Sequence, residues 1–308
     1  MTVDLNQYEF GPIKKKRHSI YWRMSIFLSC LKISASVAPN ARRLDRYNAS
    51  IKLDIETPLN GQDVILVACD RVYFFDYAIP FLRSLSSIED NFHVHLHLIN
   101  PDSEVEQHIE QLRTELANIK ISYGKDQLTG LDLPKRLNIY YNCARFIGAD
   151  HLFELGARRL LILDVDTIVR SSPWKKFVGF GAEGAFVFRP NAGKPWYKIL
   201  ANTVYLENSA QIRLFSRRYA TALLDILAKN PGYHIDQITP HYLLKIGRRR
   251  FASVFAPVPK DVMSLSFDPS ASLWTAKGSS KRETQFQMEI NNINENYRPG
   301  VGDTLEDA

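Results

Sequence analysis

The chain has 308 residues, 45% of them hydrophobic, which is enough for a packed core in one large domain or two small ones. Its formal net charge is +6, but residues 1–60 hold ten Lys/Arg against five Asp/Glu, whereas the remaining residues hold 29 against 28. Since this larger part is nearly neutral, the charge gives no reason to expect binding to nucleic acid.

The cysteines and the most apolar segment give information on the cellular compartment in which the protein is expected. Three widely separated cysteines fit no paired metal-ligand spacing and cannot all pair with each other: Cys30, Cys69 and Cys143. The apolar segment Ser19–Ala38 is interrupted by Arg23 and Lys32, so its uncharged run is far shorter than the roughly 20 residues of a membrane-spanning helix. We therefore expect a soluble cytoplasmic protein.

Residues 1–60 form a basic N-terminal extension in this interpretation. The run "KKKRH" (Lys14–His18) precedes a mixed aromatic and aliphatic helix, and "PLNG" (Pro58–Gly61) marks the end of the extension. Two interpretations stay open. One is a solvated basic tail with an extra packing helix, and the other is a contact with a partner protein or with the anionic inner face of a membrane.

From Asp63 onward, short apolar runs alternate with amphipathic ones, which predicts alternating strands and helices. The predicted strands are Asp63–Asp70, Phe92–Asn100, Ile119–Gly124, Arg158–Asp166, Gly184–Pro190 and Asn202–Ser209. The predicted helices are Phe74–Ile88, Glu104–Leu116, Ile139–Gly156 and Gln211–Asn230. This order predicts one α/β domain over residues 61–285, with a mostly parallel central sheet flanked by helices, followed by a polar segment, 286–308.

Two aspartates end one of these strands, in "LLILDVDTIVRSSPW" (Leu160–Trp174). Ligands of open α/β sheets bind at the carboxyl ends of strands, where Asp164 and Asp166 fall. Carboxylates at such a position are costly to desolvate without a cation, and hard oxygen ligands favour magnesium or manganese over zinc. The alternative is that one aspartate caps a turn and the other lies on the surface.

Four further segments occur in a fixed order around this motif: "VILVACDRVYFFDYAIPFLRSL", "YYNCARFIGADHLFELGARRL", "HIDQITPHYLL" and "WTAKGSSK". Together with the aspartate motif they resemble the nucleotide-sugar-dependent glycosyltransferases of the GT-A fold. The resemblance is greatest to retaining glycosyltransferase family eight, which includes glycogenins and bacterial lipopolysaccharide sugar transferases. It implies a GT-A fold and the transfer of a sugar from a nucleotide diphosphate to an acceptor.

The resemblance also implies roles for single residues near the donor. Asp164 and Asp166 correspond to the pair that binds Mn²⁺ or Mg²⁺ and, through it, the donor diphosphate. Asp70 corresponds to the aspartate that contacts the nucleotide base, and Tyr73 is placed to stack on it. A helix-capping role for Asp70 is an equally good explanation. Arg145 corresponds to the arginine that approaches the aspartates and the sugar phosphate, although an ordinary surface ion pair is the alternative.

The later segments supply the remaining candidates. Asp236 and Gln237 correspond to residues that face the reacting sugar, while the turn just before them also allows a plain loop. Gly278 and Lys281 fit the terminal His-x-x-Gly-x-x-Lys motif, in which the lysine binds diphosphate. The histidine of that motif, a metal ligand, is replaced by Thr275, and a hydroxyl is a much weaker ligand than imidazole.

The expected reaction is metal-dependent sugar transfer with retention of anomeric configuration. The donor is a nucleotide-diphosphate sugar, UDP-sugars being one candidate class, and the acceptor can be a glycan, a lipid or a protein. Two alternatives stay open: a non-catalytic protein that binds nucleotide sugar or a partner on the same fold, and a haloacid dehalogenase-type phosphatase. The phosphatase motif needs Thr two places after its second aspartate, where this chain has Ile168.

One further pattern is set apart from this site. In "HVHLHL", His93, His95 and His97 lie on one face of a predicted strand, because side chains alternate. Such a row can bind zinc or copper, but a polar face covered by a helix or loop is the favoured interpretation.

Overall fold

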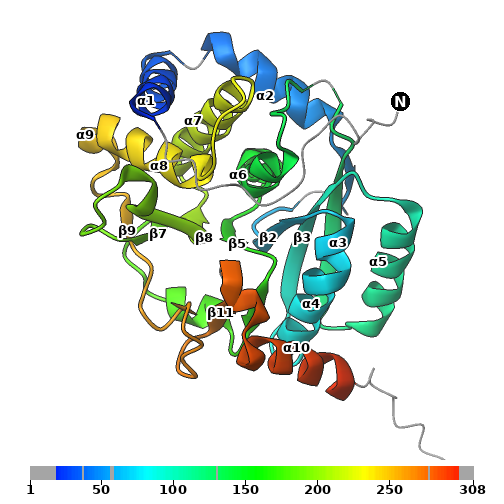
Figure 1. The fold of residues 1–308 in the computed structure, drawn as a ribbon. Helices are drawn as coiled ribbons and strands as arrows, with labels where there is room; N and C mark the ends of the chain where they lie inside the picture. Colours follow the sequence, from blue (N-terminus) through cyan, green and yellow to red (C-terminus); the bar gives the residue numbers. More distant parts are fainter. Residues whose placement is uncertain (1–18, 37, 56–58, 130, 277, 298–308) are drawn as a thin grey trace, which may run out of the picture.

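A sheet of eight strands lies at the centre of the molecule (Figure 1). The computed structural model describes residues 19–36, 38–55, 59–129, 131–276 and 278–297. In spatial order the strands are β1 (Lys52–Asp54), β4 (Ile119–Asp126), β3 (Phe92–Ile99), β2 (Asp63–Cys69), β5 (Arg159–Leu163), β8 (Ile199–Glu207), β7 (Gly184–Phe188) and β9 (Phe255–Pro257).

The strands β4, β3, β2 and β5 run parallel, and β8 is antiparallel to β5. The chain adds β3 and β4 on one side of β2 and β5 on the other, so the winding changes direction between β2 and β5. Ligands of open α/β sheets bind beyond the carboxyl ends of the strands at such a switch point. Because Leu66 pairs with Ile162, the chain segments that begin at Asp70 and Asp164 leave the sheet next to each other.

Helices cover both faces of the sheet. They are α1 (Ile20–Ala35), α2 (Ala38–Ser50), α3 (Arg71–Tyr73), α4 (Ile79–Ser86), α5 (Ser103–Glu115), α6 (Leu137–Glu154), α7 (Ala210–Leu227), α8 (Ile235–Ile246), α9 (Arg248–Phe251) and α10 (Thr284–Asn296). Shorter helical turns are η2 (Phe74–Ala78), η3 (Pro173–Phe177), η4 (Pro195–Tyr197) and η5 (Gly278–Arg282). Alternate side chains of β2 enter opposite layers: Val64 and Leu66 pack with α1, α2, α6, α7 and α8, whereas Ile65 and Val67 pack with α4 and α5.

The strands and helices predicted between Asp63 and Asn230 are observed, with ends that differ by a few residues. The helix predicted at Phe74–Ile88 begins earlier, directly after Asp70, and contains a π-helical turn, η2. Such turns insert one extra residue into a helix and are common at functional sites. Here the rings of Tyr73 and Tyr77 lie 5.1 Å apart on the same side of the turn.

The two first helices come from the predicted N-terminal extension, and both contribute to the main core. Cys30 and Ile33 of α1 and Leu44 and Tyr47 of α2 are buried in the layer that contains α6, α7 and α8. The basic run Lys14–His18 lies outside the described residues. Within the described part of the chain, no helix has both the length and the apolar character needed to cross a membrane.

A second, three-stranded sheet has the order β10 (Met263–Ser264), β11 (Leu273–Thr275) and β6 (Thr167–Val169). The strand β6 directly follows the two aspartates, and its antiparallel pairing with β11 places Thr167 opposite Thr275. After β11, η5 and α10 extend along the molecule, and Phe286 and Ile290 of α10 are buried. The first part of the predicted polar segment is therefore a packed helix, while residues 298–308 lie outside the described residues.

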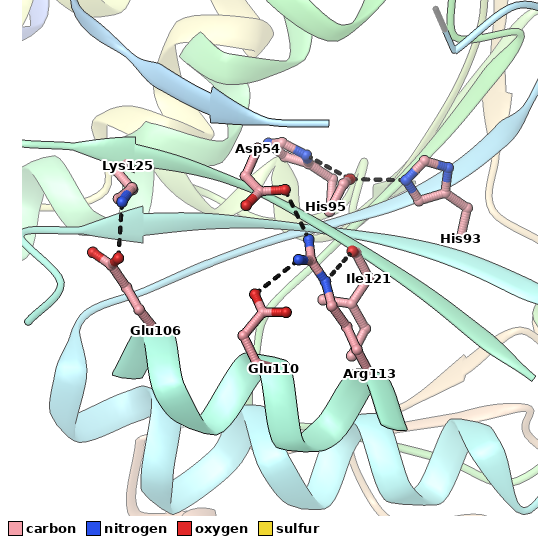
Figure 2. Close-up of polar contacts among 9 residues, drawn as sticks. Asp54, His93, His95, Glu106, Glu110, Arg113, Ile121 and Lys125 are labelled. Atoms are coloured by element: carbon pink, nitrogen blue, oxygen red, sulfur yellow. Dashed lines mark hydrogen bonds and ion pairs between the residues drawn. The ribbon is translucent and has the colours of Figure 1, made fainter. Parts of the chain in front are cut away.

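The side chains of His93, His95 and His97, here called the histidine row, are covered as predicted. His93 and His95 share the hydroxyl of Ser122 on β4, at 2.8 and 3.0 Å (Figure 2). The ring of His97 lies 3.0 Å from the Tyr47 hydroxyl of α2. The helix α6 passes directly over this ring, since a Cβ built at Gly148 would lie 3.0 Å from it.

Candidate functional site

The two aspartates that follow β5, here called the carboxylate pair, have backbone groups that are held by hydrogen bonds to β8, to β6 and to the residue after β11. The Asp164 amide donates to the Asn202 carbonyl of β8 at 3.0 Å. The Thr167 hydroxyl donates to the Asp164 carbonyl at 2.7 Å, and the amide of Ala276 donates to the Asp166 carbonyl at 3.3 Å. The turn between β5 and β6 is therefore held on both sides, which gives the two carboxylates defined positions.

Each carboxylate is paired with one cation. The Asp166 side chain is only 8% exposed, and the Lys281 ammonium lies 2.5 Å from its Oδ2 atom. Asp164 is more open, at 30%, and pairs with the Arg145 guanidinium. Burial, and then the neighbouring charge of Asp164, raise the pKa of Asp166 to about 6, although Lys281 acts against this rise. Burial disfavours the charged form of Lys281, yet the adjacent Asp166 raises its pKa above the usual value.

Arg145 reaches the site from the inner side of α6 and is 4% exposed. Besides its ion pair with Asp164 it donates to the carbonyl of Ala201 on β8, at 3.0 Å. Its Nε atom is buried and has no hydrogen-bond partner among the described residues. A buried donor without a partner is uncommon, so this guanidinium has capacity for another acceptor such as a phosphate or sugar oxygen. The surface ion pair that the sequence left open is thus not its environment.

Lys281 also contacts two aromatic rings at the start of the first crossover helix. Its ammonium lies 3.1 Å from the Tyr73 hydroxyl and 4.5 Å from the centre of that ring. The Tyr77 ring centre is 5.1 Å away. These contacts join η5, which comes late in the chain, to the segment after β2. The Tyr73 side chain remains partly exposed, at 38%, as a residue that stacks on a ligand needs to be.

Asp70 is the N-cap of the helix that follows β2. Its Oδ1 atom accepts a hydrogen bond from the Tyr73 amide at 2.9 Å. Burial raises the pKa of Asp70, and the backbone amides that it accepts from act in the opposite direction. The capping role that the sequence left open is therefore observed. The base-contacting role stays a prediction, and the same cap also fixes the orientation of Tyr73.

Asp236 and Gln237 lie in the first turn of α8, and both are buried. The turn starts at His234, whose backbone is left-handed with φ 65°. Burial raises the pKa of the Cys143 thiol, the negative charge of Asp236 raises it further, and the positive charge of Arg145 lowers it, so both charged groups lie near this thiol. The Gln237 amide, in the orientation that satisfies both of its ends, donates to the carbonyls of Trp196 and Ile199 at 2.9 and 3.2 Å. Gln237 therefore links the first turn of α8 to η4 and to the start of β8 by hydrogen bonds.

Thr275 occupies the position at which the resembled family has its histidine ligand. Its side chain is fully buried, and its hydroxyl lies 3.1 Å from that of Thr167. Within the described ranges, no three His, Cys, Asp or Glu side chains lie close enough to hold a metal ion. The carboxylate pair alone can therefore supply strong ligands here. Such a pair fits a hard divalent ion whose remaining positions are filled by phosphate oxygens and water, as is usual for magnesium.

Gly278 begins the turn that carries Lys281. Its φ is +61°, a left-handed conformation that glycine adopts without the strain of a side chain. A Cβ at this position would meet no atom within 4 Å among the described residues. Backbone conformation, and not space, is thus the reason for glycine at this point of η5.

Sequence reasoning missed Asn202, on β8 beside the carboxylate pair. The residue is 6% exposed, and neither atom of its side-chain amide has a hydrogen-bond partner within the described part of the chain. A buried amide normally uses its donors and its acceptor, so a ligand oxygen or hydroxyl is the natural partner. The signal in the sequence was the polar pair Asn202 and Thr203 within the apolar strand "ILANTVYL".

Comparison with known proteins finds a likeness in structure only, because no family model and no curated protein sequence matches the chain. The structure of glycosyltransferase GlyE from Streptococcus pneumoniae TIGR4 aligns with a TM-score of 0.52 and 12% identity, covering 76% of this chain and 63% of that of GlyE. The galactosyltransferase LgtC, in complex with donor and acceptor sugar analogs, aligns with a TM-score of 0.50 and 13% identity, covering 74% of this chain and 95% of that of LgtC.

These identities are low, and the chain spans about 63% of the length of GlyE, so the likeness concerns the fold. The order of strands, the switch point beside β2 and the helices on both faces agree with it. The chain has the GT-A-like α/β fold of these glycosyltransferases.

Proposed function

We propose that this protein is a metal-dependent glycosyltransferase that uses a nucleotide-diphosphate sugar and retains the anomeric configuration, as in family eight. One observation carries the proposal. At the switch point of a GT-A-like sheet, Asp164 and Asp166 lie together with two cations, the buried Arg145 and the half-buried Lys281. This is the arrangement of charges that a diphosphate and its divalent counterion need.

Asp164 and Asp166 would hold the divalent ion, Mn²⁺ or Mg²⁺. When bound, the ion supplies positive charge that stabilises the departing nucleoside diphosphate. With two strong protein ligands, the ion depends on donor oxygens and water to complete its shell. We therefore expect metal and donor to bind together, each more weakly without the other.

The side chains of this chain contribute in three ways. Lys281 and Arg145 place positive charge where negative charge develops on the leaving diphosphate. Tyr73 offers a partly exposed ring for the nucleotide base, with Asp70 fixing its helix. Asn202, with an amide that has no partner among the described residues, and Asp236, at the start of α8, would bind hydroxyls of the transferred sugar.

Breaking the bond to the anomeric carbon leaves positive charge on the sugar ring, as in glycoside hydrolysis. Asp236 is the acidic residue at the start of α8, and its charge, like that of Arg145, acts on the Cys143 thiol. A front-side displacement, in which the leaving diphosphate and the incoming acceptor share one face, needs no covalent intermediate. We propose this route, in which Asp236 stabilises the positive charge on the sugar ring and forms no bond to it.

A donor-hydrolysis assay with purified protein tests the proposal. Slow release of nucleoside diphosphate from a nucleotide sugar, dependent on Mn²⁺ and abolished by a chelator, supports the transferase. Release of phosphate from small phosphomonoesters would instead support a phosphatase. Stabilisation by nucleotide sugar without any turnover would support the non-catalytic alternative, which the burial of Thr275 at the family's histidine position favours.

A thermal-shift screen with nucleotide sugars identifies the donor, because a ligand stabilises the folded state in proportion to its affinity. A ligand at one hundred times its dissociation constant adds about 2.7 kcal/mol. Each nucleotide sugar is tested with Mn²⁺, without it, and against the Asp166→Asn variant. A shift that survives in that variant would place the binding elsewhere.

A further inference from the structure

The outward face of α1 carries a stripe of large apolar side chains. The stripe consists of Ile20, Tyr21, Met24, Leu28 and Leu31, whose exposed fractions are 71, 72, 52, 54 and 43%. At 3.6 residues per turn these positions fall within an arc of roughly 100°. Since Ile26, Cys30 and Ile33 are buried in the core on the opposite side, α1 is apolar on two faces. A helix packed on a domain surface normally has a polar outer face.

This stripe is not the ordinary scatter of exposed apolar residues. Ten large hydrophobic side chains are exposed in the described part of the chain, and five of them belong to this one helix. Single exposed apolar residues need no explanation, whereas a contiguous group of them marks a surface that binds a partner protein, a ligand or a membrane.

Arginines lie beside the C-terminal end of α1, at the corner where Figure 1 shows α1 and α9. Arg248, Arg249 and Arg250 of α9, with Arg218 of α7 and Ser34 of α1, line a surface cavity of about 470 Å³. Arg218 donates to the Ser34 carbonyl at 2.8 Å, which ties this cavity to α1. Among the described residues, the three arginines of α9 form no ion pair.

We infer that the apolar stripe of α1 and the arginine cluster of α9 together form a docking surface for an anionic lipid membrane. A membrane surface presents an apolar interior beneath a layer of phosphates, so it satisfies both parts at once. One guanidinium group can bind two oxygens of a phosphate at once. The arginine-lined cavity at α9 is therefore suited to the phosphates of lipid headgroups.

The docking surface lies close to the proposed sugar site. The helix α8 begins at the site with Asp236 and ends at the arginine cluster, and its 12 residues span about 18 Å. A lipid-linked glycan bound at the membrane could therefore reach the site, which makes it the acceptor class to test first. This last step rests on the proposed transferase function, whereas membrane binding does not.

Vesicle flotation of the full-length protein tests the surface. We expect at least tenfold tighter binding to vesicles with phosphatidylglycerol than to phosphatidylcholine vesicles, and most of this preference should vanish at high salt. Met24→Ser with Leu28→Ser should weaken binding to both vesicle types about tenfold. Arg248→Ser, Arg249→Ser and Arg250→Ser together should remove the preference for anionic lipid. The control for the stripe variant is Val178→Ser with Met288→Ser, which removes two apolar side chains exposed elsewhere. The control for the arginine variant is Lys52→Ser, Lys135→Ser and Lys260→Ser together, which removes three exposed cations outside the proposed surface.

Two results would overturn the inference. One is equal flotation of the wild type, the stripe variant and the arginine variant. The other is a wild-type dimer in vesicle-free solution that the stripe variant converts to monomer, because a second copy would then cover the stripe. Donor hydrolysis in vesicle-free solution should be unchanged in both surface variants, so failure of membrane binding and failure of the proposed reaction give separate readouts.

Discussion

A single strand, β2, separates the histidine row of β3 from the carboxylate pair that follows β5. In the histidine row, His93 and His95 share an uncharged partner, the Ser122 hydroxyl, whereas His97 lies between the Tyr47 hydroxyl and, at 3.4 Å, the buried carboxylate of Asp126. Burial lowers the pKa of His95 well below its usual value, so that ring stays neutral. In the carboxylate pair, by contrast, the partners are cations, and the nearby Asn202 amide has none among the described residues.

The difference suggests a structural role for the histidine row and a ligand-binding role for the carboxylate pair. Internal groups that satisfy each other, as His93 and His95 do with Ser122 and as Asp126 does with Tyr47, stabilise one packing of the protein. In the carboxylate pair the charged groups can change partners. In the proposed complex a metal ion would bind the carboxylates, and the diphosphate would bind the lysine and the arginine. Burial of polar groups alone therefore does not identify a site, whereas the kind of partner does.

The largest expected effect comes from the carboxylate pair itself. Asp166→Asn removes a charge of the proposed metal site and should lower donor turnover by about a thousandfold or more. The fold should be intact, because the backbone contacts of the turn are unchanged. Nucleoside diphosphate release and circular dichroism measure the two quantities. Full activity in this variant would refute the assignment of the site.

Lys281→Met tests whether the lysine occupies the metal position until donor arrives. Because the ammonium lies 2.5 Å from Asp166, its removal should strengthen Mn²⁺ binding to the donor-free protein, by about tenfold. The same change should weaken nucleoside diphosphate binding, by about tenfold or more, since one countercharge is lost. Titration calorimetry gives both affinities. A parallel loss of both would show a merely structural lysine.

Asn202→Ala should lower turnover by about tenfold to a hundredfold, because a hydrogen bond to the sugar is lost. Its thermal midpoint should change little, since the described residues offer the amide no internal partner. A large loss of stability with normal turnover would show that the amide is satisfied inside the protein.

Ser122→Ala is the matched change in the histidine row, and it should have the opposite profile. The variant leaves a ring nitrogen of His93 and one of His95 without the hydroxyl they share, at a cost of about 1–3 kcal/mol in the free energy of unfolding. Activity per folded molecule should be unchanged. Urea unfolding and donor hydrolysis together decide whether the two clusters differ as described.

The smallest expected effect is a pH dependence of stability. The folded-state pKa of His95 is depressed by burial, so its stabilising contribution is present above the unfolded pKa and is lost as the pH falls below about 6.5. Between pH 7 and pH 5 the wild type should lose about 1–2 kcal/mol more than His95→Gln. Melting curves at both pH values measure this difference, and an equal loss in the two proteins would show that His95 is already charged.

Much of the fold was predictable because apolar periodicity gave the strands and helices from Asp63 to Asn230. The position of the carboxylate pair followed from the strand before it. The approach of Lys281 to Asp166 did not follow from local pattern, because it depends on pairing of β6 with β11, more than a hundred residues apart in the chain. Asn202 was missed for a related reason, since an unpaired amide becomes visible only when its surroundings are known.

The late position of η5 in the chain bears on how the protein is made. Every strand of the large sheet precedes Phe267, so the sheet can assemble during synthesis before η5 has left the ribosome. Until then Asp166 lacks its lysine, and Tyr73 lacks the ammonium that rests on its ring. A nascent chain would thus acquire its architecture first and the Lys281 contacts of the proposed donor site last.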